Sequence, residues 1–340
     1  MPLRNAKTAL FALSIMGAFA LAPSAKADVK ELLEEALLPS FAAFAEASEA
    51  LNLAAQKDCT AAALQAPFQA AYDAWIPVAS LRIGPSEIGA LSISFWPDTR
   101  GAIPKTLAKL IASEDPIVSD PAAYAHVSIA ARGLTALEFM LYDQSFNTYP
   151  PESYACTLTR SIARDLALQA KDLHRGWHSE FAQVLLGAGA AGNATYLDKS
   201  EAQRALFTQI LASLEFSTDA RLARPMGSFE RPRPKRAENW RAGRSVRNIA
   251  LALKAAQAQS STLALGQLPP ELPLSTAAFE IAEQALAKIQ DPAFQDLDMP
   301  DARFRAEVLQ QTLRAAQVAL ANEIGVGLGI AAGFNALDGD

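Results

Sequence analysis

Residues 127–142 read VSIAARGLTALEFMLY and carry the pattern that decides the fold of this chain. Apolar side chains recur at three- and four-residue intervals, at Val127, Ala130, Leu134, Leu137 and Leu141. This spacing is typical of the buried face of an α-helix. Glu138 lies inside the same run, where an ionised carboxylate is costly unless it is paired, hydrogen-bonded or bound to a metal. The stretch predicts a core helix with a buried carboxylate that needs an ionic, hydrogen-bonding or metal partner.

The same helical character continues along most of the chain. Good helix formers dominate it, and the alternating β-branched runs that indicate strands are missing. Helices are predicted at residues 29–53, 59–81, 103–111, 122–142, 154–186, 199–215, 239–265, 276–289 and 301–330. Long helices with short breaks predict an all-α fold made of helical bundles.

Two interruptions indicate how the bundles are organised. Residues 82–102 contain Gly84-Pro85 and Trp96-Pro97 and predict a long non-helical connection, a kind of segment that tends to be functional. The small residues at 187–193 indicate a helix stop and a linker. We therefore expect two helical-bundle domains packed together, an N-terminal bundle over residues 28–190 and a C-terminal bundle over residues 191–340.

The N-terminus, residues 1–27, has the features of a secretory signal peptide. Arg4 and Lys7 precede an apolar run, and Ala25-Lys26-Ala27 matches the A-x-A cleavage pattern. No later run reaches the ~18 consecutive apolar residues that predict a membrane span. We expect an exported, soluble protein of the periplasm that does not span the membrane after signal cleavage.

Charge and cysteine content narrow the function classes further. The net charge of -6 argues against a general nucleic-acid binder. Cys59 and Cys156 are the two cysteines, and an oxidising compartment favours a disulfide between them, with two buried free thiols as the alternative.

A basic segment stands out in this acidic chain. Residues 221–247 contain nine basic and two acidic residues. Arginine favours bidentate contacts with carboxylate or phosphate groups, so the segment predicts a patch for an anionic ligand. The alternative is a solvated loop that also neutralises buried carboxylates, which would make Glu138 a structural residue with an arginine partner.

Several segments, taken in order, resemble the imelysin family, also described as M75 peptidase-like. Residues 133–138 (GLTALE) align with the hallmark G-x-H-x-x-E, and residues 82–85 (RIGP) resemble the family's Arg-x-Gly-Pro segment. Trp96-Pro97 resembles its Trp-Pro segment, and residues 328–340 are similar to its C-terminal signature.

The resemblance implies an all-helical fold of two bundles, with a pocket between them near the hallmark motif. It also implies an exported protein linked to iron or haem acquisition. The predicted ligand-binding side chains are Arg82, Trp96, Asp98, Thr135, Glu138, Arg244, Ser245 and Arg247. In this interpretation Glu138 binds a metal cation or pairs with an arginine, Arg82 holds it or an anionic group, and Trp96 forms an apolar wall.

The chain departs from the family pattern at the hallmark histidine, which is Thr135 here. Imidazole is a strong ligand for Zn, Cu and Fe, whereas a threonine hydroxyl is a poor one. Peptidase chemistry needs three protein ligands and an activated water, so an enzymatic role is the less favoured interpretation. We expect a binding protein for iron, another divalent metal, haem or an anionic ligand. The alternatives are a metal-dependent peptidase of M75 type and a non-catalytic partner of a membrane transporter or receptor.

Overall fold

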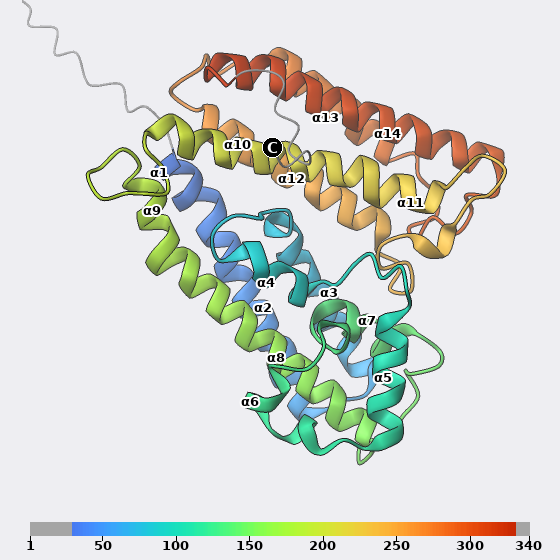
Figure 1. Cartoon of the computed structure of the whole chain (residues 1–340). Helices are drawn as coiled ribbons and strands as arrows, with labels where there is room; N and C mark the ends of the chain where they lie inside the picture. The colour runs from blue at the N-terminus through green and yellow to red at the C-terminus, as the bar shows by residue number, and fades with distance from the viewer. Residues whose placement is uncertain (1–28, 331–340) are drawn as a thin grey trace, which may run out of the picture.

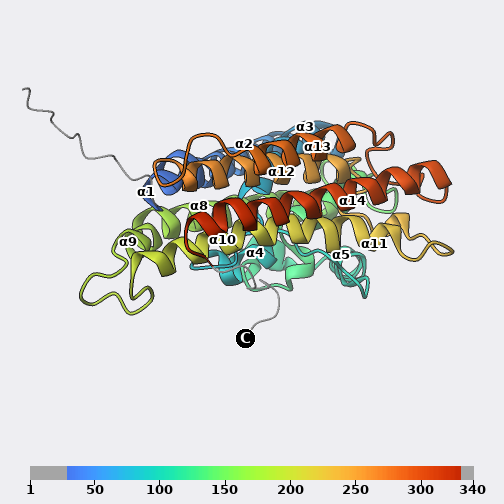
Figure 2. The same cartoon turned by 90° about the horizontal axis from the view of Figure 1, so that it is seen from above.

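The computed structural model describes residues 29–330 and shows the predicted all-α class, with the helices arranged in two layers (Figure 1). The signal-peptide prediction and the C-terminal signature after residue 330 lie outside the described residues. Figures 1 and 2 show the helices of the C-terminal half as an upper layer, with the N-terminal helices beneath. In the described part of the chain, no helix is long and apolar enough to cross a membrane.

The helical elements follow one another with short connections, and η denotes a 3-10 or π-helical segment. The N-terminal half contains α1 (Val29–Leu32), η1 (Leu33–Leu37), α2 (Leu38–Lys57), α3 (Ala61–Trp75), η2 (Ile76–Val78), α4 (Ser86–Ile93), α5 (Ala102–Ser113), η3 (Pro116–Ser119), α6 (Pro121–Tyr124), η4 (Ile129–Ala131), α7 (Gly133–Tyr142), α8 (Tyr154–Arg175), η5 (Gly176–Phe181) and α9 (Ala182–Leu186). The C-terminal half contains α10 (Lys199–Phe216), η6 (Ser217–Leu222), α11 (Ala223–Met226), η7 (Pro234–Arg236), α12 (Ser245–Ala264), α13 (Pro273–Leu286), α14 (Pro300–Leu320) and η8 (Ala321–Gly325).

Helix α2 is the centre of the N-terminal half, where it packs against both α3 and α8. Its buried aromatic residues explain this position. The Phe44 ring lies 4.9 Å from the Trp75 ring of α3, and the Phe41 ring lies 4.7 Å from the Trp177 ring that follows α8. Large buried aromatic side chains dominate core energetics, so these pairs hold the three helices together.

The two layers share a continuous interior. In the C-terminal half, α13 packs along α14, and α10 contacts both α12 and α14. Segments α1, η1 and η2 of the N-terminal half contact α12. Buried apolar residues from both halves belong to one cluster. The predicted boundary at residues 190 and 191 falls in the connection between α9 and α10 and stays a prediction.

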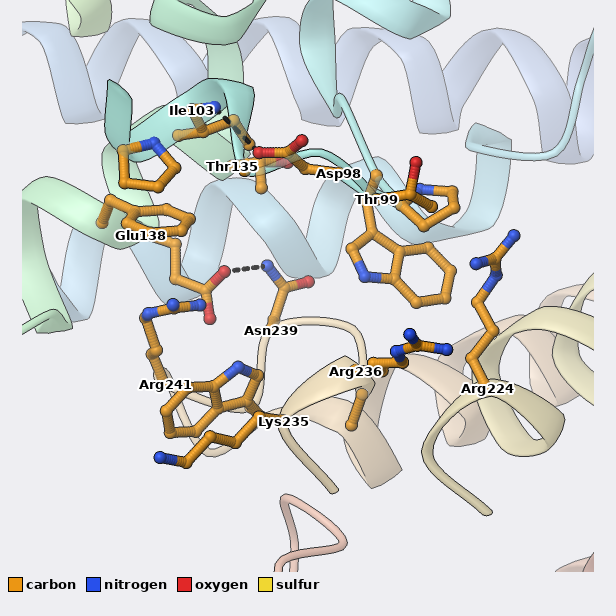
Figure 3. Close-up of a pocket in the computed structure, with 17 residues that line it drawn as sticks. Asp98, Thr99, Ile103, Thr135, Glu138, Arg224, Lys235, Arg236, Asn239 and Arg241 are labelled. Atoms are coloured by element: carbon orange, nitrogen blue, oxygen red, sulfur yellow. Dashed lines mark hydrogen bonds between the residues drawn. The ribbon is translucent and has the colours of Figure 1, made fainter. Parts of the chain in front are cut away.

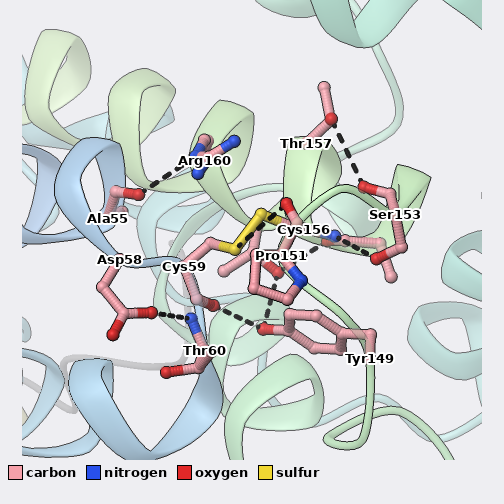
Figure 4. The surroundings of a disulfide bond; sticks show 12 residues. Ala55, Asp58, Cys59, Thr60, Tyr149, Pro151, Ser153, Cys156, Thr157 and Arg160 are labelled. Carbon is pink, nitrogen blue, oxygen red and sulfur yellow. Dashed lines mark hydrogen bonds between the residues drawn. A yellow bond between two sulfur atoms is a disulfide. The ribbon is translucent and has the colours of Figure 1, made fainter.

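The predicted disulfide is confirmed. Cys59 and Cys156 are bonded, with their Cα atoms 5.5 Å apart. Figure 4 shows the bond beside Tyr149, whose hydroxyl donates a hydrogen bond of 3.0 Å to the Cys59 carbonyl. The cross-link closes 97 residues of sequence and ties the entry of α3 to the start of α8.

Two local predictions were wrong, both next to the hallmark motif. The single helix expected over residues 122–142 is interrupted, and α7 begins only at Gly133, where φ is +70°. A left-handed residue cannot continue an α-helix, although the apolar spacing runs through it. The segment 82–102, expected to be non-helical, contains α4, which is too short for its periodicity to be read from the sequence.

Candidate functional site

Glu138 is 2% exposed in the middle of α7. Its carboxylate accepts hydrogen bonds from the Asn239 side-chain amide at 2.9 Å and from the Ala242 backbone N–H at 3.2 Å. Burial raises the pKa of the Glu138 carboxyl above its ordinary value, and the hydrogen bond from Asn239 offsets only part of this rise. Hydrogen-bond donors from the C-terminal half thus satisfy the carboxylate that the sequence singled out.

The glycine of the hallmark motif sets the position of α7. A Cβ at Gly133 would lie 2.3 Å from the Ile93 carbonyl oxygen and 2.4 Å from that of Ser92. Only glycine allows this approach, which presses the first turn of α7 against the end of α4. Two residues later, the Thr135 hydroxyl lies 3.4 Å from the hydroxyl of Ser94, the residue that follows α4.

The loop that meets Glu138 has a shape that the sequence did not predict. A helix was expected from residue 239, but α12 begins at Ser245. Asn239 has φ +51° and Gly243 has φ +66°, so the chain turns here instead of coiling. This turn directs the Asn239 amide and the Ala242 N–H toward α7.

A cavity of about 260 Å³ opens beside Glu138, between the N-terminal and C-terminal halves. Residues 96–104 and α7 line one side, and residues 224–241 line the other. Trp96, Phe139 and Trp240 provide aromatic walls. The volume lies just below the ~300–1,000 Å³ usual for drug-sized ligands, so the cavity suits a small ligand.

Basic side chains dominate the charge of this cavity. Arg224, Lys235, Arg236 and Arg241 line it, and Figure 3 shows Arg224 and Arg236 on the side away from Glu138. Arg241 is already engaged, because its Nε donates to Asp143 at 2.6 Å and its guanidinium lies 3.9 Å from the Phe139 ring centre. Within residues 29–330, the other three have no ion-pair partner, and we name Arg224, Lys235 and Arg236 the rim cations.

Asp98 lines the cavity but does not neutralise the rim cations. Its carboxylate accepts hydrogen bonds of 2.8 Å from the backbone N–H groups of Ala102 and Ile103, at the start of α5 (Figure 3). The carboxylate therefore acts as a cap for that helix. With Asp98 bound to the backbone and Glu138 on the far side, the rim keeps an excess of positive charge.

The structure brings half of the predicted site residues together. Trp96, Asp98, Thr135 and Glu138 line this cavity. The other four lie outside it. Arg82 lines a neighbouring cavity, which also includes Trp96.

Three predicted residues of the C-terminal half serve other contacts. Arg244 is 1% exposed and donates to Asn248 at 2.8 Å and to Asp73 at 2.9 Å. Arg247 also pairs with Asp73, at the surface, and together these arginines outweigh burial and hold the pKa of Asp73 below its ordinary value. The Ser245 hydroxyl donates to the Glu238 carbonyl at 2.6 Å.

A buried polar network behind the cavity was not predicted. Asn248 donates from its amide to Asn239 at 2.9 Å and to the Glu238 carboxylate at 2.7 Å. Glu238 is 4% exposed and pairs with Arg221 at 2.7 Å. The one sequence feature that could have pointed here is Glu238 itself, one of two acidic residues among the basic residues of 221–247.

The residues present do not fit the metal ion that the family resemblance suggests. Residues 29–330 contain no group of three or more His, Cys, Asp or Glu side chains arranged to hold one. Both Glu138 oxygens already accept N–H hydrogen bonds, and Thr135 replaces the imidazole of the motif. The rim cations would repel a metal cation in the same cavity.

Comparisons with known proteins identify proteins of similar fold and the family of this chain. A comparison with curated proteins found no match. An imelysin-like protein from Psychrobacter arcticum superposes with a TM-score of 0.75 at 20% identity, over 90% of this chain and 96% of that one. A protein described as an iron-regulated protein A precursor, from Parabacteroides distasonis, gives a TM-score of 0.70 at 14% identity, over 89% and 93%. The family model described as Imelysin (Peptidase M75) matches residues 37–320, and the chain therefore belongs to the imelysin family.

Proposed function

We propose that this chain is a binding protein that captures a small anionic ligand in the cavity beside Glu138. The observation that carries the proposal is the set of rim cations, which lie around one cavity without carboxylate partners among the described residues. Hydrogen bonds in which a donor or acceptor is charged are about twice as strong as neutral ones, and arginine forks match carboxylate and phosphate groups.

The aromatic walls support the same function. Arg224 lies 5.9 Å from the Trp96 ring centre, and Lys235 lies 5.9 Å from that of Trp240. A cation held near an aromatic face is oriented at little entropic cost. For these two of the three rim cations, the ligand would therefore lose less affinity to side-chain ordering.

The wider role that we propose is in iron or haem acquisition outside the cytoplasm. Residues 1–27 support export to the periplasm, and the description of the Parabacteroides relative as iron-regulated supports the link to iron. Because the cavity is lined by cations, iron would reach it as a negatively charged chelate and not as a bare ion. A membrane transporter or receptor would then receive the bound ligand.

The two rival functions make different predictions. A metal-dependent peptidase requires cleavage of a protein substrate that a chelator stops and that Glu138→Gln abolishes. A transporter partner without a small ligand requires that no anion raises the thermal stability of the protein. Saturation at 100 times Kd would stabilise a true binding protein by about 2.7 kcal/mol, which is easily measured.

Calorimetric titration of the purified protein with phosphate, citrate and ferric citrate tests the proposal. We expect at least one anion to bind, and Arg236→Gln to weaken binding by about tenfold or more, because a charged hydrogen bond contributes ~1.5–3 kcal/mol. Lys254→Gln is the matched control, since Lys254 is an exposed cation on α12 that does not line the cavity. Equal losses in both variants, or no binding of any anion, would contradict the proposal.

A further inference from the structure

A second cavity of about 300 Å³ lies next to the first and has a different character. Most of its lining is apolar, from Trp75, Ala79, Leu91, Trp96, Ala212 and Phe216. It lies between η2, α4 and α10, so both halves of the chain contribute to it.

Two of the three charged groups of the second cavity neutralise each other, and the third binds backbone carbonyls. Arg221 donates to Glu238 at 2.7 Å, so these two charges neutralise each other. Arg82 donates from Nη1 to the carbonyls of Ala79 and Leu81. The buried ion pair leaves the apolar side chains as the main surface for a ligand, with the exposed Arg82 as the one cation of this cavity that has no ion-pair partner among the described residues.

Trp96 lines both cavities. On the apolar side, the Phe216 ring meets it edge-on, with the ring centres 5.8 Å apart. On the other side, the guanidinium of the rim cation Arg224 lies 5.9 Å from its ring centre. The hydroxyl of Ser94, which lines the second cavity, lies 3.4 Å from that of Thr135, which lines the first.

We infer that the ligand is an amphipathic anion, with its charged group among the rim cations and an aliphatic or aromatic body that passes Trp96 into the second cavity. This inference rests on the proposed function of the first cavity and adds the chemical class of the ligand. A fully polar anion would leave the apolar cavity unused. An apolar body placed there would add about fourfold in affinity for each methylene buried.

Paired probes with the same carboxylate and different chain lengths test the inference. We expect octanoate to bind about 50-fold more tightly than propanoate if three methylenes enter the second cavity. Octylammonium, with the same chain and the opposite charge, is expected not to bind. Intrinsic tryptophan fluorescence provides a second readout, because Trp75 lines only the second cavity and would contact the alkyl chain of octanoate but not propanoate.

A pair of substitutions on α4 tests where the alkyl chain of octanoate binds. Leu91 is half exposed and lines the second cavity, whereas Ile88 is 84% exposed and lines neither cavity. Leu91→Gln is expected to weaken octanoate binding severalfold and to leave propanoate binding unchanged, and Ile88→Gln is expected to change neither.

The outcomes separate this inference from the proposed function. Equal affinity for propanoate and octanoate would overturn the inference that the ligand is amphipathic. If Arg236→Gln weakens the binding of both, the proposed anion site would still be supported. Octanoate binding that is insensitive to Leu91→Gln would overturn the role of the second cavity. If neither carboxylate binds and phosphate and citrate do not bind either, the proposed function itself fails.

Discussion

The arginines of one basic segment have two opposite environments. Arg221 and Arg244 are 4% and 1% exposed and bind carboxylates and amides of the interior. We call them the interior cations. The rim cations come from the same stretch of sequence, yet they face a cavity without ion-pair partners among residues 29–330. The difference teaches that a count of basic residues cannot separate cations that hold the interior together from cations that line a cavity, whereas the partner of each one can.

Breaking an interior pair should have the largest effect. Arg221→Met would leave the buried Glu238 carboxylate without its counter-ion and should lower the free energy of unfolding by about 3–5 kcal/mol. The same change at the rim, Arg236→Met, should stay within about 0.5 kcal/mol. Urea denaturation measures both. The double variant Arg221→Met with Glu238→Leu should regain most of the loss, and a double variant as unstable as the single one would contradict the pairing.

Substitution of two glycines with positive φ should give the next largest change in unfolding free energy. Gly133→Ala would place a Cβ 2.3 Å from the Ile93 carbonyl oxygen, so we expect a loss of about 2–3 kcal/mol in unfolding free energy. Gly101 also has a positive φ, of +64°, but no atom lies within 4 Å of the added Cβ. Gly101→Ala should therefore cost only about 1 kcal/mol. Thermal unfolding of the two variants should rank them in this order.

Ionic strength should have a smaller effect, which differs between the rim cations and the interior cations. Raising the ionic strength from 0.1 M to 1 M shortens the Debye length from about 10 Å to about 3 Å, so anion binding at the exposed rim should weaken by roughly fivefold. The destabilisation caused by Arg221→Met should be the same at both salt concentrations, because that pair is buried. An anion affinity that does not change with salt would argue against the rim cations as the binding groups.

The smallest effect concerns Glu138 and pH. Its pKa is raised in the folded chain, so the folded state binds this proton more tightly than the unfolded state does. The resulting stability is fully present below the unfolded pKa of about 4.3 and is lost as the pH rises through the folded pKa. The stability difference between wild type and Glu138→Gln should therefore fall from pH 4 to pH 8. A difference that grows with pH would show that the hydrogen bonds from Asn239 and Ala242 outweigh burial.

Much of the fold could be predicted because it depends on local chemistry. Helix propensity and apolar spacing identify most of the long helices, and the expectation of export to an oxidising compartment pointed to the Cys59–Cys156 bond, which the structure contains. The errors occur where a single residue overrides the periodic pattern. The left-handed Gly133 delays the start of α7 within the helix expected over residues 122–142, and the positive φ values of Asn239 and Gly243 accompany the late start of α12.

The site was only half predictable for a different reason. Trp96, Asp98, Thr135 and Glu138 follow from the order of the family motifs, and the structure brings them to one cavity. Motif order says nothing about which partner each charge meets. Arg244 and Arg247 were expected in the site, but both contact Asp73, and the rim cations, which have no ion-pair partner among residues 29–330, line the cavity instead.

The sequence by itself determined the all-helical class, the family and the unusual carboxylate at position 138, because these depend on residue type and spacing along the chain. Only the tertiary structure decided what surrounds that carboxylate. Asn239 and the Ala242 amide reach it from residues about a hundred positions away, across the contact between the two halves. Long-range pairing of this kind depends on how helices pack, and that also decides which arginines are paired with carboxylates and which line the cavity.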